Sequence, residues 1–280
     1  MRKHWIAPLV ATLTAGVVLS GCGGSDTGAP TTAAPPRASA ADPSGSLPQG
    51  DEPVTLDPAD FTTEIDNPYW PMSPGSRWVF IEADPEGTRE DVVVEVTDRT
   101  KMIANGVEAR VVIDTVSANG VPVEITEDWY AQDEVGNIWY LGEFVTNYVD
   151  GVVVDHAGSF EAGVDGAQAG IAVPANPEPG MTYRQEYYEG EAEDTAAVVT
   201  VGEEQVEVPF GYFNRDVLMT RDMVPTEPKV QELKFYAPGV GPLLSMHTDG
   251  PGGRAALVSH TPGTERVISA SEFHHEPRSR

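Results

Sequence analysis

Cysteine is nearly absent from this sequence, because Cys22 is the only one among its 280 residues. A single cysteine cannot form an internal disulfide, so the fold must be held by its core alone. Basic residues are scarce as well, with 17 Lys and Arg against 44 Asp and Glu and a formal net charge of −27. Such a negative surface repels nucleic acid and anionic head groups, which excludes both as expected partners.

Catalytic motifs and long helical patterns are also lacking. The chain has no HExxH, GxSxG or P-loop word, and its Gly-rich stretches do not follow a strand and open a helix. No segment after the N-terminal region shows a helical period over ten or more residues. We therefore expect a non-enzymatic protein without a cofactor, although bound calcium stays an alternative.

The N-terminus does contain an export signal. Arg2 and Lys3 precede an apolar run over residues 5–18, too short for a transmembrane helix and of the length typical of a secretory signal. Residues 19–22, Leu-Ser-Gly-Cys, resemble the lipobox of bacterial lipoproteins. That resemblance implies removal of residues 1–21, attachment of diacylglycerol to Cys22, and a protein held at the outer face of the cell membrane.

Two further segments have a composition typical of unfolded chain. Residues 22–60 are dominated by Gly, Ala, Ser, Thr, Pro and Asp, which cannot bury enough apolar surface to offset the entropy of ordering. We expect a disordered tether there and a flexible tail over residues 269–280. A folded part of about 200 residues remains between them.

An internal repeat is suggested when the chain is compared with itself at a shift of 105 positions. Pro74-Gly75 falls on Pro179-Gly180, Val135-Gly136 falls on Val240-Gly241, and WYA at 129–131 matches FYA at 235–237 with a slip of one. The matches keep their order and fall on turns and strands. The repeat predicts two homologous β units, residues 61–158 and residues 159–268.

Each unit has the pattern of antiparallel strands. Segments such as VVVEV at 92–96 and ARVVIDTV at 109–116 are rich in β-branched residues. The dipeptides Asn105-Gly106 and Asn119-Gly120 suit type I′ hairpin turns. We predict an all-β fold of antiparallel meanders, with the two units joined in one curved sheet or half-barrel; two separate sandwiches are the alternative.

Aromatic residues and acid clusters are the candidate functional sites. The aromatic set would fill the core or line an apolar-ligand cavity on the concave face; it comprises Trp78, Trp129, Tyr130, Trp139, Tyr183, Phe235 and Tyr236. Glu191, Glu193 and Asp194 form a weak calcium candidate, because calcium needs six to eight oxygens. A solvated hairpin tip explains these three acids equally well.

The lipobox, the Ala/Pro-rich tether and the duplicated WYA and FYAPGVG words together resemble a group of uncharacterised bacterial lipoproteins of actinobacterial type. The likeness covers residues 61 to about 258 and implies no activity. The sequence thus favours a membrane-anchored envelope lipoprotein that binds an unknown protein or apolar ligand. A carrier of lipid in a curved sheet and a metal-dependent hydrolase are the alternatives.

Overall fold

The computed structural model describes residues 47–83, 89–225, 228, 231–248 and 253–264. The predicted signal peptide, Cys22 and the predicted tail over 269–280 lie outside these residues. The described chain is built of strands, with a single 3-10 turn at Pro58–Asp60. None of its helices is long and apolar enough to span a membrane.

The strands follow one another as short-turn hairpins. The first seven are β1 (Phe61–Thr62), β2 (Arg77–Ala83), β3 (Arg89–Met102), β4 (Glu108–Ala118), β5 (Val121–Asp133), β6 (Ile138–Val149) and β7 (Val152–Asp155). The other ten are β8 (Phe160–Glu161), β9 (Gln168–Val173), β10 (Thr182–Tyr188), β11 (Ala192–Val201), β12 (Val206–Val208), β13 (Gly211–Phe213), β14 (Leu218–Met223), β15 (Gln231–Ala237), β16 (Gly241–His247) and β17 (Arg254–Thr261). All pairings between them are antiparallel, as predicted.

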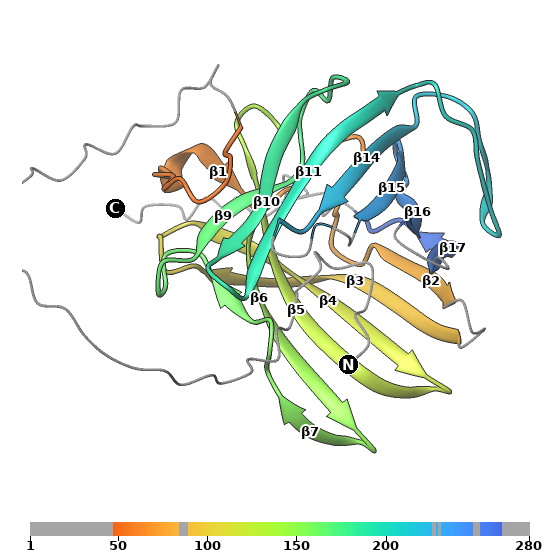
Figure 1. Ribbon diagram of the computed structural model, residues 1–280, viewed down its shortest axis with the longest axis horizontal. Coiled ribbons are helices and arrows are strands. Elements are labelled where there is room, and N and C mark those ends of the chain that lie inside the picture. The colour runs from red at the N-terminus through yellow and green to blue at the C-terminus, as the bar shows by residue number, and fades with distance from the viewer. Residues whose placement is uncertain (1–46, 84–88, 226–227, 229–230, 249–252, 265–280) are drawn as a thin grey trace, which may run out of the picture.

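Twelve strands close into one barrel, in the order β5-β4-β3-β2-β17-β16-β15-β14-β11-β10-β9-β6 (Figure 1). Closure occurs because β6 pairs with β5 on one side and with β9 on the other. The prediction of an all-β fold is confirmed, but the half-barrel is wrong, since the sheet is closed. A closed sheet leaves none of these twelve strands with an open edge.

The first and last barrel strands of the chain, β2 and β17, pair with each other. Trp78 pairs with His260 in this ladder, and their rings stack with centroids 5.0 Å apart. The Gly263 amide donates to Ser76 Oγ at 2.9 Å, across 187 positions of sequence. We call the β2–β17 pairing the seam.

Two predicted hairpin turns differ in their backbone. Asn119 and Gly120 both have positive φ, 53° and 77°, as a type I′ turn requires. Gly106 has a φ of 93°, whereas Asn105 is not among the described residues with positive φ. The type I′ prediction is therefore confirmed at the first site and wrong at the second.

The C-terminal part of the predicted tether is packed against the barrel. Arg184 Nη1 donates to the carbonyl oxygens of Gly50 and Glu52, at 2.8 Å each. Leu47, Val54 and Leu56 pack against the core. The tether prediction is wrong for residues 47–60, because these few apolar side chains and the buried guanidinium supply contacts that composition alone does not reveal.

One end of the barrel is covered by the segment before β2. Trp70 is buried there, with its ring 6.5 Å from that of Trp78 and 5.5 Å from that of Tyr130. Ile65 and Met72 are buried beside it. We call residues 63–76 the plug, because they close the end where β2 begins and β5 finishes.

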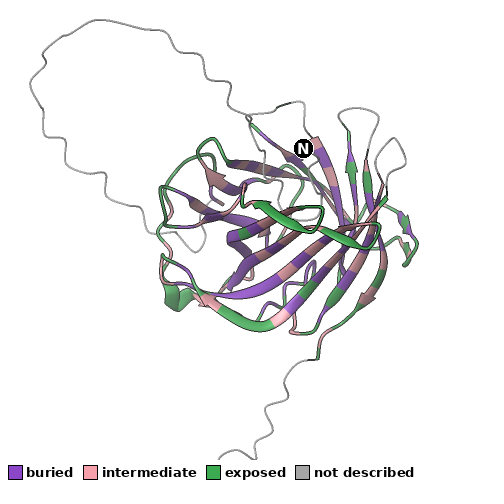
Figure 2. Ribbon diagram, turned by 90° about the horizontal axis from the view of Figure 1, so that it is seen from below, coloured by how far each residue is buried: buried purple, intermediate pink, exposed green. Residues whose placement is uncertain are grey.

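The two halves of the chain share one local feature at corresponding positions of the predicted repeat. A Pro-Gly turn leads into β2 and another into β10, and the Gly75 and Gly180 amides donate to Val96 and Val198 at 2.8 and 2.9 Å. Alternating bands of buried and exposed residues run along the strands of both halves (Figure 2). Both units contribute to one barrel, and their descent from a duplication stays a prediction.

Candidate functional site

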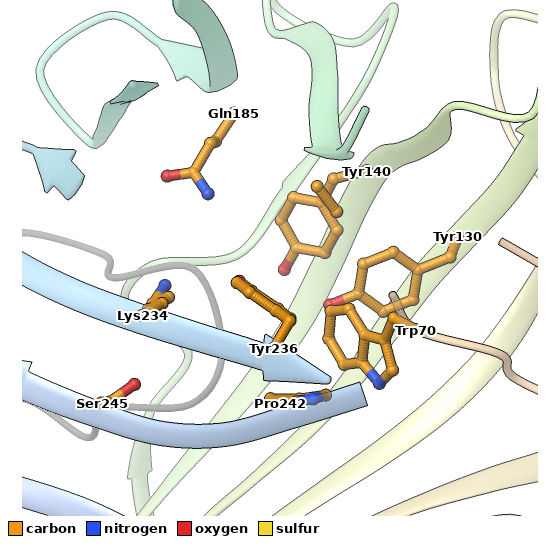
Figure 3. A pocket seen from close by; sticks show the side chains of 9 residues that line it. Trp70, Tyr130, Tyr140, Gln185, Lys234, Tyr236, Pro242 and Ser245 are labelled. Carbon is orange, nitrogen blue, oxygen red and sulfur yellow. The ribbon is translucent and has the colours of Figure 1, made fainter. Parts of the chain in front are cut away.

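Side chains from widely separated strands meet inside the barrel, in its lumen. A cavity of about 30 Å³ lies there, with space for roughly two water molecules. Figure 3 shows side chains from the plug and from opposite walls around it. The lining comprises Trp70, Tyr130, Tyr140, Ala172, Gln185, Lys234, Tyr236, Pro242 and Ser245.

Lys234 on β15 places a buried ammonium at this cavity. Its Nζ lies 2.7 Å from Asp222 Oδ2 and 3.4 Å from Glu232 Oε2. Burial would lower the pKa of Lys234, but the two acids outweigh it and hold that pKa well above its usual value. Burial raises the pKa of Glu232 to about 7, although Lys234 opposes the rise.

Buried carboxyl groups are unusually numerous in the barrel, and Lys234 pairs with two of them. Eight acidic residues on barrel strands are buried, and we call them the carboxyl belt: Glu82, Asp114, Asp128, Glu143, Glu186, Asp194, Asp222 and Glu232. Acidic residues of this kind are almost never fully buried without a partner.

The belt contains three pairs of acids that lie directly opposite each other on neighbouring strands. Asp128 faces Glu143 between β5 and β6, and Glu186 faces Asp194 between β10 and β11. The third pair is Asp222 and Glu232, which share Lys234. Like charges in directly opposite positions destabilise a sheet, so folding alone does not favour this arrangement.

Burial shifts the belt towards its protonated form. It raises the pKa of Glu82 to about 9, with Glu90 and Glu232 adding to the effect. It raises the pKa of Asp128 to about 7, although the Tyr140 hydroxyl, which donates to Asp128 Oδ1 at 2.8 Å, opposes the rise. Burial likewise raises the pKa values of Glu143 and Glu186 well above their usual range. In neutral solution these raised pKa values favour bound protons on Glu82, Glu143 and Glu186.

Some belt oxygens receive no hydrogen bond from the protein. Glu186 is fully buried, and neither of its carboxyl oxygens accepts a bond from an N–H or hydroxyl group in the described part of the chain, although a side-chain hydrogen bond with Asp194 contributes to its raised pKa. A donor is also lacking, within the described chain, for Oε1 of Glu143, Oε2 of Glu82 and Oδ1 of Asp114. A buried acceptor without a donor costs about 1–3 kcal/mol, which makes these oxygens candidates for contact with a ligand.

The other buried cations of the described chain have partners outside the belt or at its margin. Arg184 donates to the carbonyl oxygens of Ala169, Gly50 and Glu52, and Arg110 donates to Thr63. His247 on β16 pairs in register with Glu232. The belt therefore contains more carboxyl groups than buried cations, and bound protons rather than cations neutralise several of them.

The predicted aromatic set divides between the two faces of the sheet. Tyr130 and Tyr236 line the cavity. Tyr183 is buried but is not among the residues that line the cavity, and Asp222 and Tyr236 add to the effect of burial in raising its pKa. Trp78 packs against the plug, and its Nε1 donates to the Val240 carbonyl at 2.7 Å.

The remaining three aromatic candidates lie on the outer face, so the prediction that they line a cavity is wrong. Trp129 lies under Lys101, whose Nζ is 4.4 Å from the ring centroid. Trp139 donates to Asp133 Oδ2 at 2.8 Å. Phe235 alternates with Lys234 and Tyr236, which both face inward. The physical reason is the two-residue period of a strand, which sends neighbours to opposite faces.

The weak calcium candidates are separated by the same alternation. Glu191 is exposed, Glu193 accepts a bond from the Gly190 amide at 2.9 Å, and Asp194 is buried opposite Glu186. In the described residues no group of three or more His, Cys, Asp or Glu is arranged to hold a metal ion. His156 stacks on Phe144, far along the fold from His260 at the seam.

Sequence reasoning missed the carboxyl belt because acids were interpreted as solvated. A signal was present in the strand pattern. Asp114 has the same parity as Val112 and Val116 in β4, and all three are buried. An acid at an inward position of an apolar strand marks a buried carboxyl.

Comparisons with known proteins give little further guidance. No family model and no curated protein matches this chain. One solved structure matches it, from a Parabacteroides distasonis protein provisionally assigned as a lipoprotein, with 12% identity and a TM-score of 0.36. The match covers 69% of this chain and 98% of that one.

Proposed function

We propose that this protein is an exported lipoprotein, anchored at the outer face of the cell membrane through Cys22, whose barrel is a non-enzymatic binding module. The observation that carries the binding role is the carboxyl belt. Eight buried acids, only two of which pair with the buried Lys234, destabilise a fold that apolar residues could fill, and such departures from good packing are typical of functional sites.

The anchor is supported by the sequence around Cys22. The lipobox ends at the only cysteine of the chain, after a basic and then apolar segment of signal length. A diacylglycerol chain pair gives firm attachment, since each buried methylene contributes about 0.8 kcal/mol.

The size of the lumen favours a small ligand over an acyl chain. The cavity of about 30 Å³ accommodates a group of a few heavy atoms, and its wall combines aromatic rings with the polar groups of Gln185, Lys234 and Ser245. The carrier of lipid and the metal-dependent hydrolase each lack an observation that favours them.

Two measurements test this proposal. The full chain produced in a bacterial host that performs lipid modification should incorporate labelled palmitate and fractionate with membranes, whereas Cys22→Ala should do neither. Native mass spectrometry of the purified lipoprotein should show an added small-molecule mass that disappears after unfolding. Equal membrane recovery of Cys22→Ala would remove the anchor from the proposal, and a bare polypeptide mass would count against the binding role.

A further inference from the structure

Gln185 on β10 is a buried polar side chain that faces the lumen cavity. It is 6% exposed and lines the cavity, and its side-chain amide forms no hydrogen bond within the described chain. In Figure 3 this amide points into the space that the Tyr140 hydroxyl and the Lys234 ammonium also face. Buried polar groups are normally hydrogen-bonded, so an amide left without a partner requires an explanation.

The backbone around Gln185 is irregular. The register of β10 against β11 shifts between Arg184 and Glu186, so Gln185 lies in a β-bulge and has no partner position on β11. Gly170 of β9 lies against this bulge, and an added Cβ there would collide with the Gln185 carbonyl group. Bulges redirect side chains and are over-represented beside functional sites. The absence of a side chain at Gly170 thus leaves room for a bulge that presents an unbonded amide.

Two hydrogen-bond donors accompany this amide in the cavity wall. The Lys234 ammonium has three N–H groups, and its two acid partners, Asp222 and Glu232, lie 2.7 and 3.4 Å from its Nζ. One N–H group therefore remains for the cavity. The Tyr130 hydroxyl also belongs to the wall and forms no hydrogen bond within the described residues. An occupant that satisfies these donors needs a strong acceptor.

The charges at the cavity favour an uncharged occupant. No carboxyl group of the described chain lies in the wall, so a cation would meet the Lys234 ammonium without a counter-charge. An anion would meet an ammonium whose charge Asp222 and Glu232 already offset. In both cases the cost of removing an ion from water is not compensated. A neutral group with an acceptor and a donor side by side avoids this cost.

Resting on the proposed binding role, we propose that the lumen cavity binds a small uncharged carboxamide. The carbonyl oxygen of the carboxamide has two lone pairs and accepts hydrogen bonds from the Tyr130 hydroxyl and the Lys234 ammonium. Its N–H group donates to Gln185 Oε1. Its alkyl part lies against the rings of Tyr140 and Tyr236, which line the same cavity.

The test is a titration of the full-length lipoprotein, purified in detergent, with four probes of nearly the same size and shape: acetamide, acetone, acetate and acetamidinium. Saturation transfer from the protein to the methyl group of the probe, measured by NMR, reports binding. Acetamide should bind with a Kd of about 0.1 mM or weaker, because its few heavy atoms limit the affinity. Acetone lacks the donor and should bind about tenfold more weakly, and the two ions should show no saturation transfer.

Gln185→Met removes the amide but keeps a side chain of similar length, and Gln205→Met is its matched control in the exposed segment before β12. We expect Gln185→Met to bind acetamide and acetone equally, whereas Gln205→Met should keep the preference for acetamide. Thermal unfolding without a probe should show that Gln185→Met is as stable as the parent or more so, because an unbonded buried amide has been removed. A merely structural role would not change the preference between two probes.

Tyr130→Phe tests the acceptor end of the probe independently. It removes one hydroxyl donor and keeps the ring, so acetamide and acetone should both bind about fivefold more weakly while the ratio of their affinities stays the same. This variant keeps the proposal falsifiable if Gln185→Met does not fold.

Three results would overturn the proposal: binding of acetate or acetamidinium as strongly as acetamide, an unchanged preference in Gln185→Met, or unchanged affinities in Tyr130→Phe. Failure of all four probes to bind would mean that water alone satisfies these groups, and the carboxamide would be wrong. If native mass spectrometry then finds another small molecule, the binding role stands. If it finds none, the binding role fails too.

Discussion

Glu82 offers the sharpest test of the protonated belt. It lies on β2, is 5% exposed, and pairs in register with Glu90. Burial, followed by the charges of Glu90 and Glu232, raises its pKa from 4.5 to about 9. Between pH 5.5 and 7.5 the folded protein therefore keeps this proton, whereas the unfolded chain has lost it.

The sign and size of the effect follow from this difference in bound protons. Because the unfolded chain binds fewer protons, the free energy of unfolding falls as pH rises, by about 1.4 kcal/mol per pH unit for one carboxyl. Across these two pH units Glu82 accounts for a loss of about 3 kcal/mol. Glu82→Gln has a neutral amide that cannot titrate. Between pH 5.5 and 7.5 its free energy of unfolding should therefore fall by about 3 kcal/mol less than that of the parent protein.

Urea unfolding at pH 5.5, 6.5 and 7.5, followed by tryptophan fluorescence, measures this slope. Glu134→Gln, at the exposed tip of the β5–β6 hairpin, is the control and should follow the parent protein. If Glu82→Gln and the parent lose stability in parallel, the Glu82 carboxyl is ionised in the folded state and the argument for a protonated belt is refuted at this position.

Three other predictions concern single contacts. Tyr140→Phe should lower the free energy of unfolding in urea by about 1 kcal/mol at pH 5.5 and by about 2 kcal/mol at pH 8.5. The reason is that the Tyr140 hydroxyl bonds Asp128 more strongly once that acid is ionised. An equal loss of stability at both pH values would contradict this. Gly170→Ala should lower the free energy of unfolding by about 3 kcal/mol or more in thermal unfolding, because a Cβ at this position collides with the backbone of β10. Gly211→Ala is the control. Its added Cβ meets only a side-chain ring at ordinary distance, so the free energy of unfolding should fall by less than about 1 kcal/mol. Asp133→Ala should lose about 3 kcal/mol, since its carboxylate accepts bonds from three backbone amides and two side chains of the β5–β6 turn; a loss below about 1 kcal/mol would show that the turn forms without it.

Local pattern was enough to predict the strands and several of their turns. β-branched runs gave β3 and β4, and Asn119-Gly120 gave the turn after β4, because both depend on neighbours in sequence. Closure of the barrel was not predictable in this way. It depends on β6 meeting β9 and on β2 meeting β17, pairings that no local pattern specifies.

The candidate site was predictable only in part. Tyr130 and Tyr236 were selected as lining residues and do line the cavity. Trp129 and Phe235 were selected with them, because neighbouring aromatic residues that are both buried give no indication of which face is the lumen. The acids of the belt were missed because a net charge of −27 suggests surface acids everywhere.

The seam also orders the folding of the chain in time. β17 is the last strand that the structure describes, and the Ser76–Gly263 bond spans 187 positions. Hairpins such as β3–β4 can form as soon as their own residues are available, but ring closure must wait for β17. Contacts so distant in sequence make folding slow. A chain that emerges from a membrane with its N-terminus first would thus complete its hairpins early and remain an open sheet, with β2 unpaired on one side, until nearly all of it had crossed.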